Sequence, residues 1–267
     1  DYSTGNVDFK GSVHVLGNVI SGFSVKATQN IEIEGLAENC YLEAGGSINI
    51  KGGIVGGKKG VVKSGKDITL LFAENCYIEA GSKVIVGDVL NSEIFAGDRI
   101  LAVSGNGRVV GSKLCAKNII EANIFGSPTD TKTYLEVGHE PKSMLKLKNL
   151  QLEQAKNKNI LQEINQKLAV LEEQKQTNGL SQEKKALYDR LNFAITELRK
   201  RIEFMSAEIE ELEAAMSFGA SASITARKKA YPNVHIKINN NVYVCTDELI
   251  CPIFYENEGE IKLGIYR

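Results

Sequence analysis

Short stretches of alternating apolar and polar residues recur along residues 8–125 of the chain. The two clearest copies, 37–45 and 73–81, both begin Ala-Glu-Asn-Cys-Tyr and start thirty-six residues apart. Weaker copies fall between and around them at spacings of sixteen to twenty residues. Self-similarity at such a period is typical of a solenoid, in which each repeat buries its apolar edge by stacking on its neighbours.

Each copy predicts a short strand with two different faces. Cys40, Leu42 and Ala44 point to one side of the strand, and Tyr41 and Glu43 point to the other. Turns rich in Gly, Asn and Asp separate the strands, as in a parallel β-helix. About seven rungs at ~4.8 Å each would stand roughly 34 Å tall. A left-handed β-helix uses a regular six-residue period, whereas the spacing here drifts, so we predict the right-handed, three-sided form.

A different period begins after the repeats. Residues 142–176 and 181–217 contain no Gly or Pro and are rich in helix formers. Their apolar residues follow the three-four spacing of a coiled-coil seam, with polar Gln154 and Asn157 at two further seam positions, where such residues set the register. The predicted seam is Leu147, Leu150, Leu161, Ile164, Leu168 and Leu171 on the first helix and Leu191, Ile195, Leu198, Ile202, Met205, Ile209 and Leu212 on the second.

The break between the two helices, 177–181, predicts an antiparallel hairpin. Gly179 provides a stop and Ser181 a helix N-cap, and so short a connection returns the chain alongside itself. Lysines near the start of the first helix then face glutamates near the end of the second: Lys142, Lys146 and Lys148 against Glu208, Glu210, Glu211 and Glu213. Because a rung-like segment returns at 223–226, we predict a β-helix over 1–140, an inserted hairpin over 141–218, and final rungs with a cap over 219–267.

Composition and charge narrow the function classes. The formal net charge of −1 gives no reason to expect nucleic acid or an anionic membrane as a partner. No apolar run reaches the ~18 residues of a membrane span, so membrane insertion is not expected. Five cysteines without a Cys-x-x-Cys pair argue against a disulfide scaffold and favour the cytoplasm. The chain begins at Asp1 without an initiator Met, so we expect part of the natural protein to precede it.

Residues that resemble reactive groups have simpler explanations. Residues 52–59 fit the Gly-x4-Gly-Lys frame of a phosphate loop but lack the following Ser or Thr and helix, so we expect corner glycines. His14 and His235 should face outward on strands, and His139 should lie near the hairpin, with no carboxylate or Cys near them at ligand spacing. Cys40 and Cys76 should lie two rungs apart, roughly 9–10 Å, beyond disulfide reach.

Catalysis is not expected either. Asp67, Asp88 and Asp98 fall at turns, where aspartate stabilises the backbone, and the chain has no Trp to line a carbohydrate groove. We therefore predict no catalytic residue, no cofactor and no metal. The outward pairs Tyr41–Glu43 and Tyr77–Glu79 repeat and form a candidate partner face, with an ordinary half-exposed sheet as the alternative.

The order of the motifs resembles the C-terminal region of the flagellar assembly protein A family, a bacterial group. The resemblance covers essentially the whole chain and is carried by residues 4–9, 11–13, 48–56, 133–138 and 231–236, with a similar coiled-coil insertion between the last two. Asn233 stands where that family commonly has Gly, and we expect the family's usual N-terminal domain to lie outside this sequence. The resemblance implies a non-enzymatic cytoplasmic protein linked to flagellar assembly or polar placement, with no catalytic residues to carry over.

The first rungs also resemble the β-helical domain of the septum-site inhibitor of bacterial cell division. This resemblance rests on residues 11–17 and 53–57, and that family has no coiled-coil insertion, so it indicates shared architecture.

Our leading hypothesis is a scaffold or adaptor that binds a protein partner, or a second copy as a homo-oligomer, through the hairpin and the β-helix faces. The alternatives are a polymer-forming or division-regulating module and, third, a carbohydrate-active enzyme.

Overall fold

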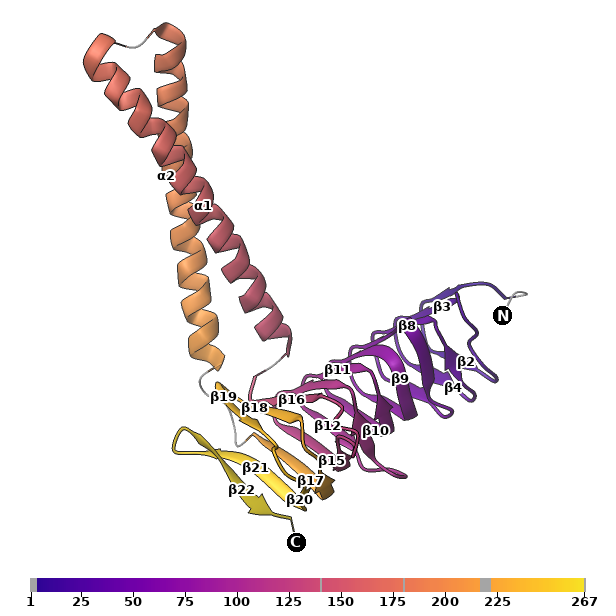
Figure 1. Ribbon diagram of the computed structural model, residues 1–267. Coiled ribbons are helices and arrows are strands. Elements are labelled where there is room, and N and C mark those ends of the chain that lie inside the picture. The colour runs from indigo at the N-terminus through magenta and orange to yellow at the C-terminus, as the bar shows by residue number, and fades with distance from the viewer. Residues whose placement is uncertain (1–3, 140, 180, 217–221, 267) are drawn as a thin grey trace. The chain divides into compact units, whose positions relative to one another are not determined.

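The computed structural model describes residues 4–139, 141–179, 181–216 and 222–266 (Figure 1). It is mainly β and contains a solenoid of about seven turns, with two helices inserted late in the chain. By contacts, the chain divides into two compact units: residues 1–141 together with 219–267, and residues 142–218.

Three parallel ladders build the solenoid, one for each side of a turn. The first contains β1 (Val7–Phe9), β3 (Ser24–Ala27), β6 (Tyr41–Ala44), β8 (Ile54–Ser64), β9 (Ile68–Ala80), β11 (Glu93–Ala96), β14 (Lys113–Ala116), β16 (Thr133–Val137) and β18 (Val234–Ile238). The second contains β2 (Val13–Val15), β4 (Ile31–Ile33), β7 (Ile48–Ile50), β9, β10 (Lys83–Leu90), β12 (Arg99–Ala102), β15 (Ile119–Phe125) and β17 (Ser223–Ala230). The third contains β5 (Ala37–Glu38), β8, β9, β10, β13 (Arg108–Val110), β15 and β17. Long strands such as β9 bend at corners and so contribute to more than one ladder.

The predicted alternation is confirmed by the core. Leu42, Val62, Ile78 and Ile94 stack in register on successive turns of the first ladder, and each is 0% exposed. The outward residues between them are exposed or half-exposed. Strand pairing is the same for either hand of the coil, so the right-handed turn stays a prediction.

The Asn that recurs in the two clearest copies has a backbone role. Asn39 and Asn75 have φ angles of +39° and +49°, close to the left-handed region that asparagine tolerates better than most residues. Each Asn turns the chain into the next strand of the first ladder, β6 or the last part of β9. The repeat therefore encodes both a strand and the corner before it.

A column of glycines follows the first ladder at the next corner. A Cβ atom at Gly81 would lie 2.1 Å from the carbonyl oxygen of Gly65, and one at Gly65 would lie 2.3 Å from that of Gly45. These contacts are with backbone, so neighbouring turns would have to move apart to admit a side chain. By contrast, a Cβ at Gly17 would meet nothing within 4 Å.

Gly81→Ala is accordingly expected to lower the free energy of unfolding by about 1–3 kcal/mol, the usual range for overpacking. The matched Gly17→Ala variant, where no positive φ and no neighbour intervenes, should change it by less than about 0.5 kcal/mol. Urea unfolding of both variants provides the measurement. Equal stabilities would contradict the close approach at this corner.

The helices lie in sequence between two strands of the solenoid. α1 (Pro141–Asn178) follows β16, and α2 (Gln182–Met216) precedes β17. β17 pairs with β15, and β18 pairs with β16, so the ladders continue after the insertion. Gly179 has a φ of +71°, and the Lys184 backbone N–H donates to Ser181 Oγ at 3.4 Å, which confirms the predicted stop and N-cap.

Contacts between the two helices show that they run antiparallel. Lys146 Nζ lies 2.6 Å from Glu208 Oε1, and Arg201 pairs with Glu153 at 2.5 Å, so positions later in α1 meet positions earlier in α2. The side chain of Lys142 lies outside the described residues. All thirteen predicted seam residues are buried or half-buried. Of the polar seam positions, Gln154 donates to Ser206 Oγ at 2.7 Å and Asn157 is only 9% exposed.

Antiparallel strands cover the last turn of each ladder. β19 (Asn241–Val244) pairs with β18, β20 (Leu249–Ile250) with the end of β17, and β21 (Pro252–Asn257) with its beginning. β22 (Glu260–Ile265) then pairs with β21. These antiparallel strands occupy the open edge of each ladder, as an open parallel stack requires.

Candidate functional site

The outward side of the first ladder carries a repeated Lys–Tyr–Glu arrangement. Tyr41 and Tyr77 both lie in register with Val61, so the structure places them two turns apart on one face. We call this surface the ladder face and define it by the outward residues Lys26, Tyr41, Glu43, Lys63, Tyr77, Glu79 and Phe95. The predicted partner-face residues are thus brought together on one side of the solenoid.

Each repeat of the ladder face has the same internal contacts. Tyr41 Oη donates to Glu43 at 3.0 Å, and Lys26 lies 3.5 Å from that carboxylate and 5.4 Å from the centre of the Tyr41 ring. Two turns on, Tyr77 donates to Glu79 at 3.3 Å, and Lys63 lies 3.9 Å from Glu79. The arrangement combines an aromatic surface with alternating charge, which suits recognition of another protein.

The two tyrosines of this face remain protonated donors at neutral pH. Burial, together with the neighbouring carboxylate of Glu79, raises the pKa of Tyr77 to about 12. Burial and Glu43 also raise the pKa of Tyr41 above its usual value. Both phenols therefore present an apolar ring with a fixed hydroxyl rather than an added negative charge.

Further along the same ladder, the outward residues enclose a groove of about 480 Å³. Tyr134 stacks on His235 with ring centres 4.8 Å apart, and Lys237 pairs with Glu136 at 2.7 Å. His235 faces outward on β18, as predicted from its apolar neighbours. Aromatic and charged groups thus extend along this side of the solenoid beyond the predicted pairs.

Two phenylalanines on the hairpin were missed by the sequence analysis. Phe193 and Phe204 of α2 are 70% and 72% exposed, although most large apolar side chains of the chain are buried. A spacing of eleven residues is close to three helical turns, so both lie on one side of α2. The signal was present in the sequence, because both fall outside the seam spacing and yet are large and apolar.

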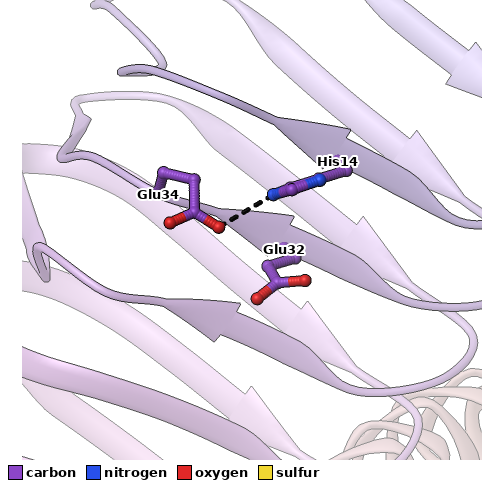
Figure 2. A group of neighbouring side chains, drawn as sticks. All are labelled: His14, Glu32 and Glu34. Atoms are coloured by element: carbon purple, nitrogen blue, oxygen red, sulfur yellow. Dashed lines mark hydrogen bonds and ion pairs between the residues drawn. The ribbon is translucent and has the colours of Figure 1, made fainter.

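The expectation that no carboxylate lies near His14 is wrong. Figure 2 shows His14 of β2 beside two glutamates: Glu32 of β4, and Glu34, the residue that directly follows β4. His14 Nε2 lies 2.8 Å from Glu34 Oε1. Stacking causes the proximity, because His14 and Glu32 are register partners on adjacent turns although eighteen residues apart. For His139 and His235, the described residues contain no comparable group of ligand atoms.

The glycine run at 52–59 is a corner of the solenoid. Residues 54–64 form the bent strand β8, and no helix starts there. A Cβ at Gly56 would lie 2.5 Å from both Asn75 O and Cys76 Cβ, so glycine is needed for close packing between turns. The corner interpretation is confirmed.

The three turn aspartates bond to the backbone or side chains of neighbouring turns. Asp88 Oδ1 accepts from the Arg108 N–H at 2.9 Å, and Asp67 Oδ1 accepts from the Lys83 N–H at 3.3 Å. Burial would raise the pKa of Asp98, but hydrogen bonds from Arg99 and Asn118 hold it below its usual value. These contacts support the predicted structural role for all three.

The cysteines are free thiols, four of them buried. Cys76 and Gly60 are register partners on adjacent turns, and the residue after Gly60 hydrogen-bonds to the backbone of Cys40 on the turn before. Cys40 and Cys76 therefore lie two turns apart, as predicted. Burial raises the pKa of Cys40 and Cys76 to about 11 and that of Cys115 and Cys245 to about 12. Thiolate, the reactive form, is therefore scarce at all four.

At pH 8 we expect iodoacetamide to modify the native chain only at the half-exposed Cys251, and all five thiols after unfolding. A thiol with a pKa of about 11 has about one thiolate in a thousand at this pH. Intact-mass spectrometry against time measures the number of labels. Rapid native labelling at Cys40 or Cys76 would contradict the burial of the core.

These features define a class of protein: a three-sided β-solenoid with an inserted helical hairpin and an outward aromatic and charged face. No helix in the described ranges is both long enough and apolar enough to span a bilayer. The model of the Flagellar Assembly Protein A beta solenoid domain matches residues 1–261, so the chain belongs to this family. No curated protein and no solved structure matches the chain.

Proposed function

We propose that this protein is a non-enzymatic scaffold or adaptor in flagellar assembly or placement, and that it binds a protein partner through the ladder face and the hairpin. Family membership supports the flagellar connection. The observation that carries the proposed mechanism is the repeated Lys–Tyr–Glu arrangement around Tyr41 and Tyr77. The proposal places the protein in the cytoplasm, which the five free thiols support.

The ladder face supplies a rigid recognition surface. The core turns beneath it are fully buried, so the outward side chains keep fixed spacings along the ladder. Tyrosines bury much apolar area on binding and lose little conformational freedom, and such residues dominate the energy of many protein interfaces. The carboxylates and lysines between them would select a partner of complementary charge.

The hairpin supplies a second surface. Its seam is occupied by its own two helices, so partner binding would use the outer faces. Phe193 and Phe204, about 16 Å apart along α2, are the most exposed aromatic residues among those that the structure describes in that unit. They are well suited to anchor in pockets of a partner helix or of a second copy.

Polymer formation, the main alternative, requires free edges at both ends of the solenoid. At the C-terminal end, β19, β20 and β21 already occupy the three ladders. Stacking of turns onto that end would displace them, which favours discrete complexes over filaments. Light-scattering mass across a concentration series distinguishes these cases, because a filament grows without limit whereas a monomer or dimer does not.

Affinity capture from host extract tests the proposal with two surface variants of the full protein. Tyr41→Ala with Tyr77→Ala removes the aromatic rings of the ladder face, and Phe193→Ala with Phe204→Ala removes those of the hairpin. Neither pair contributes to the fully buried core or the seam, so we expect both variants to fold. A genuine partner should be recovered by the original chain and reduced about tenfold or more by at least one variant.

Thr69→Ala, an exposed position on the second ladder, is the matched control and should retain full recovery. If both double variants capture the same proteins in the same amounts as the original chain, the proposed surfaces are wrong.

A further inference from the structure

The cluster of His14, Glu32 and Glu34 lies at the N-terminal end of the second ladder, away from the ladder face. One imidazole nitrogen of His14 and one carboxylate oxygen from each glutamate all lie within 4.8 Å of one another (Figure 2). We propose that these three residues bind a divalent transition-metal ion of the Zn²⁺ class, in competition with the Lys51 ammonium group. Nothing in the scaffold role requires this site.

Geometry is the first support. Zinc binds nitrogen and oxygen ligands at about 2.0–2.2 Å, which places two ligand atoms of one tetrahedral ion about 3.4 Å apart. His14 Nε2 and Glu34 Oε1 are 2.8 Å apart, and the other separations within the group stay below 4.8 Å. Small rotations of partly exposed side chains are enough to place one ion among all three.

The backbone already holds the ligands from two turns. His14 and Glu32 are register partners in the parallel pair β2–β4, and Glu34 directly follows β4. Outward side chains at paired positions on adjacent turns are held about 5 Å apart by the ladder itself. An ion here would therefore tie the first turn to the second.

Lys51 is the second support, because it shows that the carboxylates already attract a cation. Its Nζ lies 2.7 Å from both oxygens of Glu34 and 3.5 Å from Glu32. A metal ion must displace this tethered ammonium group.

The ligand chemistry selects the kind of ion. Mg²⁺ and Ca²⁺ prefer all-oxygen ligands, whereas an imidazole with two carboxylates suits Zn²⁺, Co²⁺ or Ni²⁺. Three protein ligands leave a coordination position for water or for a group from a partner. The site would thus be an open one.

Calorimetric titration of the full chain with ZnCl₂ tests the proposal, and CoCl₂ provides a visible-absorption readout. The original chain should bind one ion, and His14→Ala should weaken binding about tenfold or more because one of three ligands is lost. Lys51→Met should strengthen binding about two- to fivefold, the range that corresponds to an exposed ion pair. His235→Ala, the matched outward histidine outside the cluster, should bind as the original chain does.

Stability provides a second readout, since an ion that binds only the folded chain raises its melting temperature. Zinc should raise the melting temperature of the original chain and of His235→Ala, but not that of His14→Ala. Absence of binding in both the original chain and Lys51→Met would overturn the proposal. Equal binding by His14→Ala, or equal affinity for Mg²⁺ and Zn²⁺, would overturn it as well.

Discussion

Replacement of Ile78 by alanine is expected to lower the free energy of unfolding by about 2–5 kcal/mol. Ile78 is 0% exposed and stacks in register between Val62 and Ile94, so its loss leaves a cavity inside a column of buried side chains. The turns above and below are fixed by their own hydrogen bonds and cannot collapse into the gap. Chemical unfolding followed by circular dichroism gives the change directly.

The matched control is Leu71→Ala on the same strand, where the side chain is 57% exposed. We expect it to change stability by less than about 0.5 kcal/mol. Similar losses for Ile78→Ala and Leu71→Ala would contradict the inward and outward assignment that the solenoid requires. A shift of one residue in register would reverse the two results, because it exchanges the two faces of a strand.

The second large effect is expected in the hairpin. Ile195 lies in the seam and is 8% exposed, so Ile195→Asp both removes an apolar side chain and places a carboxylate among apolar ones. Loss of the side chain alone costs about 2–5 kcal/mol, and desolvation of the charge adds to it. We expect the helical circular-dichroism signal to melt at a much lower temperature while the β signal persists, because the two units have separate cores.

Thr196→Asp, the adjacent exposed position, serves as control and should leave the helical transition within a few degrees of the original. If Ile195→Asp instead melts both signals together, the hairpin and the solenoid do not fold as separate units.

The architecture could be predicted from the sequence because individual residues of each repeat identify the inward positions and the corner. Ala37 to Gly45 and Ala73 to Gly81 show which side chains point inward, and Asn39 and Asn75 show where the corner lies. The change from a period of two to the three-four spacing likewise predicted the hairpin, and Gly179 with Ser181 predicted its turn.

Contacts between neighbouring turns could not be predicted from the sequence, because the number of residues in each turn varies. Register partners are separated by eighteen residues for His14 and Glu32, twenty for Leu42 and Val62, and sixteen for Val62 and Ile78. With such drift, the outward neighbour of a given residue cannot be assigned to one position. This is why the carboxylates beside His14 were missed, whereas the inward positions, most of them apolar, tolerate the same uncertainty.

The proposed scaffold role makes its most direct prediction in cells. Motility of a host strain that lacks the gene should be restored by the original protein. It should also be restored by Asp88→Asn, which removes the carboxylate of a turn aspartate that an enzymatic mechanism would require. The double variants Tyr41→Ala with Tyr77→Ala and Phe193→Ala with Phe204→Ala should accumulate to the same level, and at least one of them should fail to restore motility. Full restoration by both double variants, or loss of function in Asp88→Asn at normal abundance, would contradict the account.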